Sequence, residues 1–167
     1  MKELVNITNR GFDRERILEY EMRVLSKLQF DINVPTLNRF IQRFCQLIES
    51  DITDFYLASY FGELSMLKLD MYQWKPSLTA SACIFLARKM MRKEVSWPQI
   101  LQDTTGYSGK QAKDSARIIC KAINKANVKN YYFPIYRKYR QEKLLRVSKI
   151  PIDIKKNAQK DYNKVYG

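Results

Sequence analysis

Two groups of acidic side chains are spaced closely enough for acid–base chemistry, in which one carboxyl group donates a proton and another accepts it. The groups consist of Asp13, Glu15, Glu19 and Glu21, and of Glu49, Asp51 and Asp54. Both fall where helices are expected to begin, and acidic residues are common there because they complement the positive end of the helix dipole. We therefore interpret them as helix-end acids and predict no catalytic pair in either group.

Other residues that commonly carry out catalysis are absent or isolated. The sequence contains no histidine, which removes the most frequent general base and a frequent metal ligand. Cys45, Cys83 and Cys120 form no CxxC pair, so we interpret them as apolar thiols in a reducing compartment. No glycine-rich phosphate loop and no metal-ligand spacing is present. We expect a protein that is not an enzyme and that takes no cofactor, metal or small-molecule ligand.

Positive charge is concentrated toward the C-terminus. The net charge is +13, and residues 129–167 alone hold 11 basic and 3 acidic residues. Tyr136 and Tyr139 alternate there with basic residues, a pattern able to bind nucleic acid, although no base-reading motif accompanies it. The basic residues are Arg137, Lys138, Arg140, Lys143 and Arg146. The other interpretation, which we favour, is a solvated and fraying chain end.

No segment has the pattern of a membrane span or a signal peptide. The longest nearly apolar run, residues 78–87, is too short to cross a bilayer. The first ten residues lack the apolar stretch of a signal peptide. We expect a soluble intracellular protein.

Helical periodicity dominates the segments that must position these residues. A helix is predicted at about 13–29, with Asp13 as a suitable N-cap, and Pro35 separates it from the next helix. Apolar residues at helical spacing then predict helices near 37–48 and 51–67. A helix therefore precedes the main group of helices and is set apart from it by a proline.

Residues 78–90 are apolar on nearly every side, which predicts a helix in the centre of the fold. Gly62 lies inside a neighbouring helix and predicts a close helix–helix approach. Capping-box spacing at Ser96–Gln99 and Ser108–Gln111 predicts two further helix starts. The sequence therefore predicts an all-α fold: a five-helix bundle at about 36–127 around a central buried helix, preceded by one extra helix.

The order of several motifs resembles that of mitotic A- or B-type cyclins. The block ILEYEMRVLSKLQFDINVPTLNRFIQRF, residues 17–44, is similar to the junction between the two cyclin boxes. This junction has a helix that carries a glutamate, a Leu-x-Phe-Asp turn and a Pro-Thr-x-x-x-Phe motif. The run KPSLTASACIFLAR, residues 75–88, resembles the central helix of the C-terminal box. The ordered set of similar motifs covers about residues 3–150.

The resemblance implies the cyclin fold and a particular domain organisation. Residues 1–32 would be the remnant of an N-terminal cyclin box, with its last helix at about 13–29. Residues 33–130 would form a complete C-terminal cyclin box, and residues 131–167 a basic extension. Because the earlier helices of the first box have no counterpart in this sequence, the resemblance implies a truncated chain. Part of the apolar face of the helix at about 13–29 is then expected to be bare and to promote self-association.

The resemblance also implies contact with a kinase through four residues. These are Glu21, Leu25, Phe30 and Ile32. Glu21 matches the glutamate that contacts the kinase backbone near its mobile C-helix, and the three apolar residues match positions against which that helix packs. Without the resemblance, simpler interpretations stay open. Glu21 is then an exposed helix carboxylate paired with Arg14 or Lys27, and the apolar residues are ordinary core.

The function implied is that of a regulatory, activating subunit of a cyclin-dependent serine/threonine protein kinase that controls cell-cycle progression and mitosis in nucleus and cytoplasm. The kinase is the expected partner in a heterodimer, and neither a membrane nor nucleic acid is expected as one. One helix and a turn offer little interface area, so we expect weak kinase activation by this chain alone and robust activation once upstream residues are restored. The alternative is a cyclin-fold nucleic-acid-binding or transcription-factor-like module that uses the basic C-terminal segment.

Overall fold

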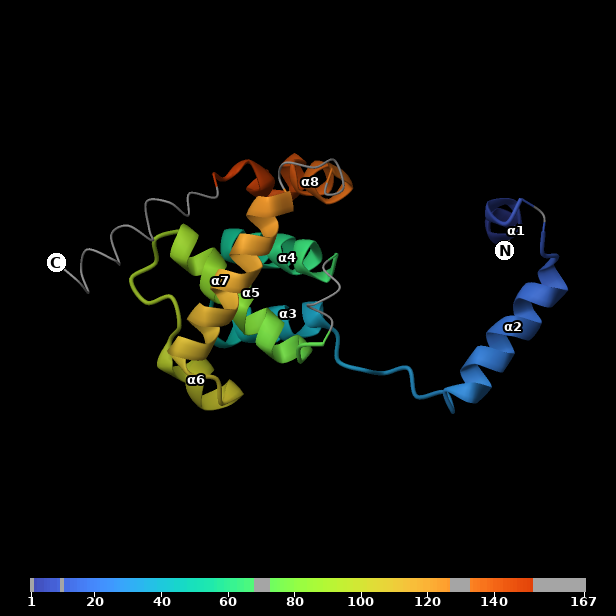
Figure 1. Ribbon diagram of the computed structural model, residues 1–167, viewed down its shortest axis with the longest axis horizontal. Coiled ribbons are helices and arrows are strands. Elements are labelled where there is room, and N and C mark those ends of the chain that lie inside the picture. The colour runs from blue at the N-terminus through green and yellow to red at the C-terminus, as the bar shows by residue number, and fades with distance from the viewer. Residues whose placement is uncertain (1, 10, 68–72, 127–132, 152–167) are drawn as a thin grey trace. The chain divides into compact units, whose positions relative to one another are not determined.

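The structure, a computed structural model, describes residues 2–9, 11–67, 73–126 and 133–151. Within these ranges its regular secondary structure consists of helices alone (Figure 1). The chain divides into two compact units at the boundary between Val34 and Pro35. The all-α fold class predicted from the periodicity is confirmed.

The first unit contains α1 (Lys2–Ile7) and α2 (Arg14–Lys27). Asp13 caps α2 as predicted, because its side chain accepts a hydrogen bond from the Arg16 amide at 2.8 Å. The rings of Phe12 and Tyr20 meet edge to face with their centroids 6.0 Å apart. No residue of α2 is buried, and Leu18, Met22 and Val24 are exposed, so part of its apolar face is bare, as the sequence predicts.

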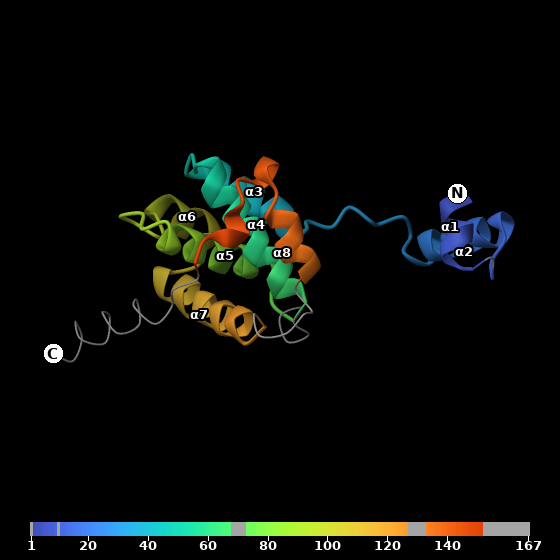
Figure 2. The same ribbon diagram turned by 90° about the horizontal axis from the view of Figure 1, so that it is seen from above.

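The second unit is built around α5 (Pro76–Met90). Three helices pack against it: α3 (Leu37–Leu47), α4 (Ile52–Met66) and α7 (Gly109–Ala126). The short helix α6 (Gln99–Thr105) precedes α7, and Figures 1 and 2 show α5 between its neighbours in both views. The predicted five-helix bundle with a central helix is confirmed.

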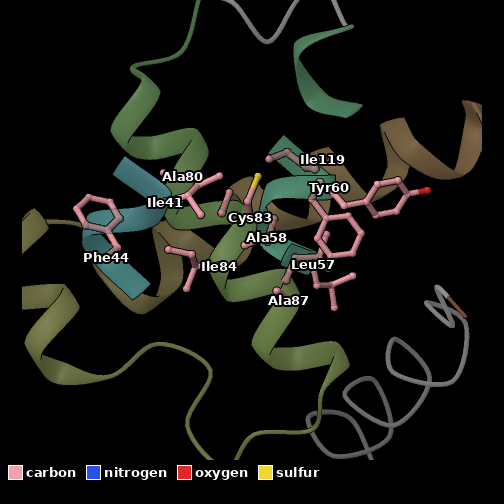
Figure 3. Packing of buried hydrophobic residues seen from close by; sticks show 14 of the residues in the cluster. Ile41, Phe44, Leu57, Ala58, Tyr60, Ala80, Cys83, Ile84, Ala87 and Ile119 are labelled. Atoms are coloured by element: carbon pink, nitrogen blue, oxygen red, sulfur yellow. The ribbon is translucent and has the colours of Figure 1, made fainter. Parts of the chain in front are cut away.

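Small side chains allow α5 to occupy this central place. Ala80, Ala82 and Ala87 are fully buried, and Ile84 is 1% exposed. Figure 3 shows Ala80, Ile84 and Ala87 on α5 among side chains of the surrounding helices. Small residues let helix axes approach closely and leave few voids. Phe85 differs from its neighbours, since it is only half-buried at the edge of the core.

Gly62 marks the close approach of α3 and α4 that the sequence predicts. A Cβ atom at this position would lie 3.1 Å from Ile41 Cδ1 and 3.3 Å from Leu37 Cδ2. A contact that short leaves no room for a side chain unless its neighbours move. Glycine therefore lets these two helices pack closely, at some cost in helix propensity.

Two predicted capping boxes have different outcomes. At the start of α7, the Ser108 amide donates to Gln111 Oε1 at 2.9 Å and the Gln111 amide donates to Ser108 Oγ at 3.2 Å. This box is confirmed. The box at Ser96 is wrong, because α6 begins only at Gln99 and its N-cap is Pro98, which has no capping side chain.

The segment after the bundle packs onto α4. It contains α8 (Phe133–Tyr139) and two 3₁₀-helices, η3 (Glu142–Leu144) and η4 (Val147–Lys149). Tyr139 is 3% exposed and Val147 is fully buried. The favoured interpretation as a solvated end is therefore wrong for this part of the segment, and residues 152–167 lie outside the described residues.

Candidate functional site

Glu21 lies exposed on α2 and projects its carboxylate from the helix surface. Among the described residues it forms no ion pair, and the pairing with Arg14 or Lys27 that we considered is not present. The ion pair of this helix joins Arg23 to Glu19 at 3.9 Å instead. The carboxylate of Glu21 is thus available to a partner.

Leu25 lies one turn beyond Glu21 on the same face of α2, because residues four apart are neighbours on a helix surface. The end of the helix then brings Phe30 next to Leu25. The Phe30 amide donates to the Leu25 carbonyl at 2.9 Å, and the Gln29 amide donates to the Ser26 carbonyl at 3.0 Å. These paired bonds form a Schellman motif, which commonly places the residues at its two ends in contact.

Phe30 and Ile32 are exposed, by 58% and 64% respectively. Leu25 is half-buried, so of the predicted apolar contacts only Leu25 has partial cover. The interpretation of Phe30 and Ile32 as ordinary core residues is therefore wrong. The four predicted residues lie between the middle of α2 and the start of the extended segment that follows it. We call them the α2 row (Glu21, Leu25, Phe30 and Ile32).

A second cluster of charged residues, which sequence reasoning missed, joins α4 to the end of α5. Asp54 is 2% exposed, with Arg88 Nη1 at 3.5 Å and Lys93 Nζ at 3.8 Å from its Oδ2. Lys93 also pairs with Asp51, the N-cap of α4. Burial raises the pKa of Asp54 in spite of both cations, and the hydrogen bond from Lys93 lowers the pKa of Asp51.

This cluster links helices and shows no catalytic geometry. The Arg88 guanidinium donates to the Val95 carbonyl at 3.0 Å, which secures the loop after α5. Each acid of the cluster has a cation at its side, and the described residues include no group of three or more potential metal ligands. Asp51 and Lys93 are 42 positions apart, and no local spacing signals such a pair.

The three cysteines are buried, as the sequence indicates. Burial raises the pKa of Cys45 and of Cys120 to about 11, and it raises the pKa of Cys83 further still. A thiol must lose its proton to act as a nucleophile. None of the three therefore serves as a reactive cysteine at neutral pH.

The basic segment does not present the aromatic clamp considered for nucleic acid. Tyr139 is buried with its ring centroid 5.2 Å from that of Tyr60, so it has no free face for a base. Lys138 pairs with Glu63, and Arg146 pairs with Glu142 at 3.1 Å. Two basic side chains of this segment are thus paired with acidic residues of the same chain.

Within the described ranges, no helix has the length and apolar character required to cross a membrane.

Comparison with known proteins identifies the class of protein to which this bundle and its preceding helix belong. Residues 35–153 match the family described as "Cyclin, C-terminal domain". The match begins at Pro35, the first residue of the second unit. The chain belongs to the cyclin family. The resemblance drawn from the motifs is confirmed.

The relatives are A- and B-type cyclins. Cyclin-B1-5 of Oryza sativa subsp. japonica is 28% identical over 90% of this chain and 33% of its own length. G2/mitotic-specific cyclin-B of Dictyostelium discoideum is 30% identical over 91% of this chain and 35% of its own length. Cyclin-A3-4 of Arabidopsis thaliana is 28% identical over 91% of this chain and 42% of its own length. The chain therefore spans well under half the length of these relatives.

Proposed function

We propose that this chain acts as the regulatory, activating subunit of a cyclin-dependent protein kinase and binds the kinase through the α2 row. The observation that carries the proposal is the geometry of this row. It combines a free carboxylate at Glu21 with exposed apolar side chains at Phe30 and Ile32. Membership of the cyclin family and the A- and B-type relatives support the same role.

The chemistry of the row suits a mobile helix of the kinase. Phe30 and Ile32 offer apolar surface, and a helix that packs against them is held in one position. Glu21 is placed to accept hydrogen bonds from backbone amides of the kinase near that helix. A partner that binds only the active position of a mobile helix shifts the population toward the active state, in which the catalytic Lys–Glu pair of the kinase is formed.

In this proposal the chain itself carries out no reaction, and the kinase performs the phosphoryl transfer. The proposed place of action is the nucleus and cytoplasm, in cell-cycle progression and mitosis. A stable protein interface buries at least about 1,000 Å² in total, which is more than one helix and a turn commonly supply. We therefore expect this chain alone to bind and activate the kinase weakly.

Calorimetric titration of the chain with a recombinant cyclin-dependent kinase tests the proposal. Glu21→Ala is expected to weaken binding by about 1–3 kcal/mol, because hydrogen-bond donors of the kinase lose their partner. Glu19→Ala is the matched control, since Glu19 is an exposed glutamate of the same helix. Asp114→Ala, on the solvent side of α7, is a second control.

Equal effects of Glu21→Ala and Glu19→Ala, or no effect of Glu21→Ala, would exclude the α2 row as the kinase site. Salt separates this function from nucleic-acid binding. Affinity for a nucleic acid falls steeply with salt concentration, whereas affinity based on apolar contacts changes little.

A further inference from the structure

α2 ends in two consecutive residues with left-handed backbone conformation. The angle φ is 51° at Gln29 and 58° at Phe30. In a Schellman motif one residue, at the position of Gln29 here, adopts this conformation, and it is usually glycine because glycine has no Cβ atom. A left-handed backbone at a bulky residue such as Phe30 is a genuine outlier.

Other helices of the same chain end in one left-handed residue or in two. At the end of α3 the Ser50 amide donates to the Cys45 carbonyl at 2.9 Å, with Glu49 left-handed at φ 46°. Arg92 has the same role after α5, with φ 55°. Neither Ser50 nor Lys93, which follow these residues, has a positive φ. η3 ends as α2 does, with Leu145 at φ 53° and Arg146 at φ 52°, and the Arg146 amide donates to the Gln141 carbonyl at 3.1 Å. What distinguishes the end of α2 is therefore the residue that it holds in this backbone, an exposed phenylalanine.

The end of α2 places this exposed aromatic side chain on a fixed backbone. The amides from Leu28 to Ile32 all donate to backbone carbonyls: Leu28 to Val24, Gln29 to Ser26, Phe30 to Leu25, Asp31 to Leu28 and Ile32 to Phe30. A loop with this many internal bonds has little conformational freedom, although Phe30 and Ile32 are exposed. Strained backbone that is held in place by its surroundings commonly occurs at ligand-binding sites, where it preorganises the contact.

We propose that Gln29 is a positioning residue for the kinase contact, whose left-handed backbone fixes Phe30 beside Leu25 in the orientation that an apolar kinase helix binds. This inference rests on the proposed function and deepens it. Gln29 need not touch the kinase itself. Fixing Phe30 in advance reduces the entropy lost when the two proteins associate, which strengthens binding without an added contact.

Two substitutions of Gln29 test this role in the full chain. They differ in how well the new residue tolerates a positive φ. Gln29→Val disfavours the left-handed backbone, because valine is β-branched, and is expected to weaken binding of a recombinant cyclin-dependent kinase about tenfold. Gln29→Gly accepts the same backbone and is expected to keep the affinity within about twofold. The hydrogen exchange of the Phe30 amide is expected to be slow in the wild type and faster in Gln29→Val.

Glu49 supplies matched controls, because it has the equivalent place at the end of α3 and is exposed. Glu49→Val and Glu49→Gly are expected to alter stability and to leave kinase affinity unchanged. If Gln29→Val leaves the affinity unchanged, or if Glu49→Val weakens it equally, Gln29 has no positioning role.

Phe30→Ala separates this failure from failure of the proposed function. If Phe30→Ala weakens kinase binding and Gln29→Val does not, the kinase site stands and the positioning role is wrong. If Phe30→Ala has no effect, or if the wild-type chain does not bind the kinase at all, the proposed function fails and the positioning role fails with it.

Discussion

Tyr139 donates a hydrogen bond from its hydroxyl group to Glu63 Oε1 at 2.9 Å, which joins α8 to α4 between residues 76 positions apart. The Tyr139 ring is buried against Tyr60, and burial together with the bond to Glu63 raises the pKa of Tyr139 well above its usual range. Lys138 reaches the same carboxylate from the solvent side. Glu63 of α4 thus binds two neighbouring residues of α8, Tyr139 through a hydrogen bond and Lys138 through an ion pair.

Removing only the hydroxyl group of Tyr139 measures the contribution of its hydrogen bond with Glu63 to stability. Tyr139→Phe is expected to lower the free energy of unfolding by about 1–2 kcal/mol, because it removes a bond to a charged acceptor and keeps the ring. Lys138→Ala is expected to cost no more than about 1 kcal/mol, since its ion pair is exposed. Urea unfolding gives both values, and a larger loss for Lys138→Ala would contradict the structure.

The centre of the bundle is expected to be more sensitive to truncation at Ile84 than at Phe85. Ile84→Ala is expected to destabilise by about 2–5 kcal/mol, because Ile84 is 1% exposed inside α5 and its removal leaves a cavity. The sequence alone predicts about 3–5 kcal/mol for Phe85→Ala, the usual cost of a buried phenylalanine. Since Phe85 is half-buried, the structure predicts a smaller loss of stability for Phe85→Ala than for Ile84→Ala. Thermal unfolding of the two variants shows which of them is less stable.

Gly62 and Ile41 are expected to show strong energetic coupling. Gly62→Ala adds a methyl group 3.1 Å from Ile41 Cδ1, and such overpacking costs about 1–3 kcal/mol, which offsets the gain in helix propensity of about 1 kcal/mol. Ile41→Val removes the Cδ1 atom in question. In that background Gly62→Ala is expected to be clearly less harmful, or stabilising. A double-mutant cycle with a coupling energy near zero would show that the approach of α3 and α4 is looser than the structure indicates.

Asp54 and Asp51 are expected to influence the pH dependence of stability in opposite directions. Burial raises the folded-state pKa of Asp54, so its contribution to stability is fully present below the unfolded-state pKa of about 3.9 and is lost as the pH rises through the folded-state value. The hydrogen bond from Lys93 lowers the folded-state pKa of Asp51. Its contribution is present above the unfolded-state pKa and is lost as the pH falls through the folded-state value.

Urea unfolding of Asp54→Asn and Asp51→Asn across the acidic range to neutral pH checks both signs. As the pH rises, the stability of the wild type is expected to fall relative to Asp54→Asn and to rise relative to Asp51→Asn. Trends of the same sign for the two variants would show that the two carboxylates occupy similar environments, contrary to the structure.

The sequence by itself determined the features that depend on neighbouring residues. Asp13 caps α2, and Ser108 with Gln111 caps α7, through bonds between residues three apart. The all-round apolar character of residues 78–90 requires cover on every side, which places α5 in the centre. Gly62 predicts a close approach because a mid-helix glycine has a cost in helix propensity that packing offsets.

Only the tertiary structure decided which distant side chains meet. Tyr139 and Val147 belong to a basic, polar stretch, and their burial depends on where α8 and η4 lie against α4. The pairing of Lys93 with Asp51 likewise requires the end of α5 to meet the start of α4. Local bonds repeat at fixed spacing along the chain, whereas these contacts arise from the packing of elements, which no short spacing encodes.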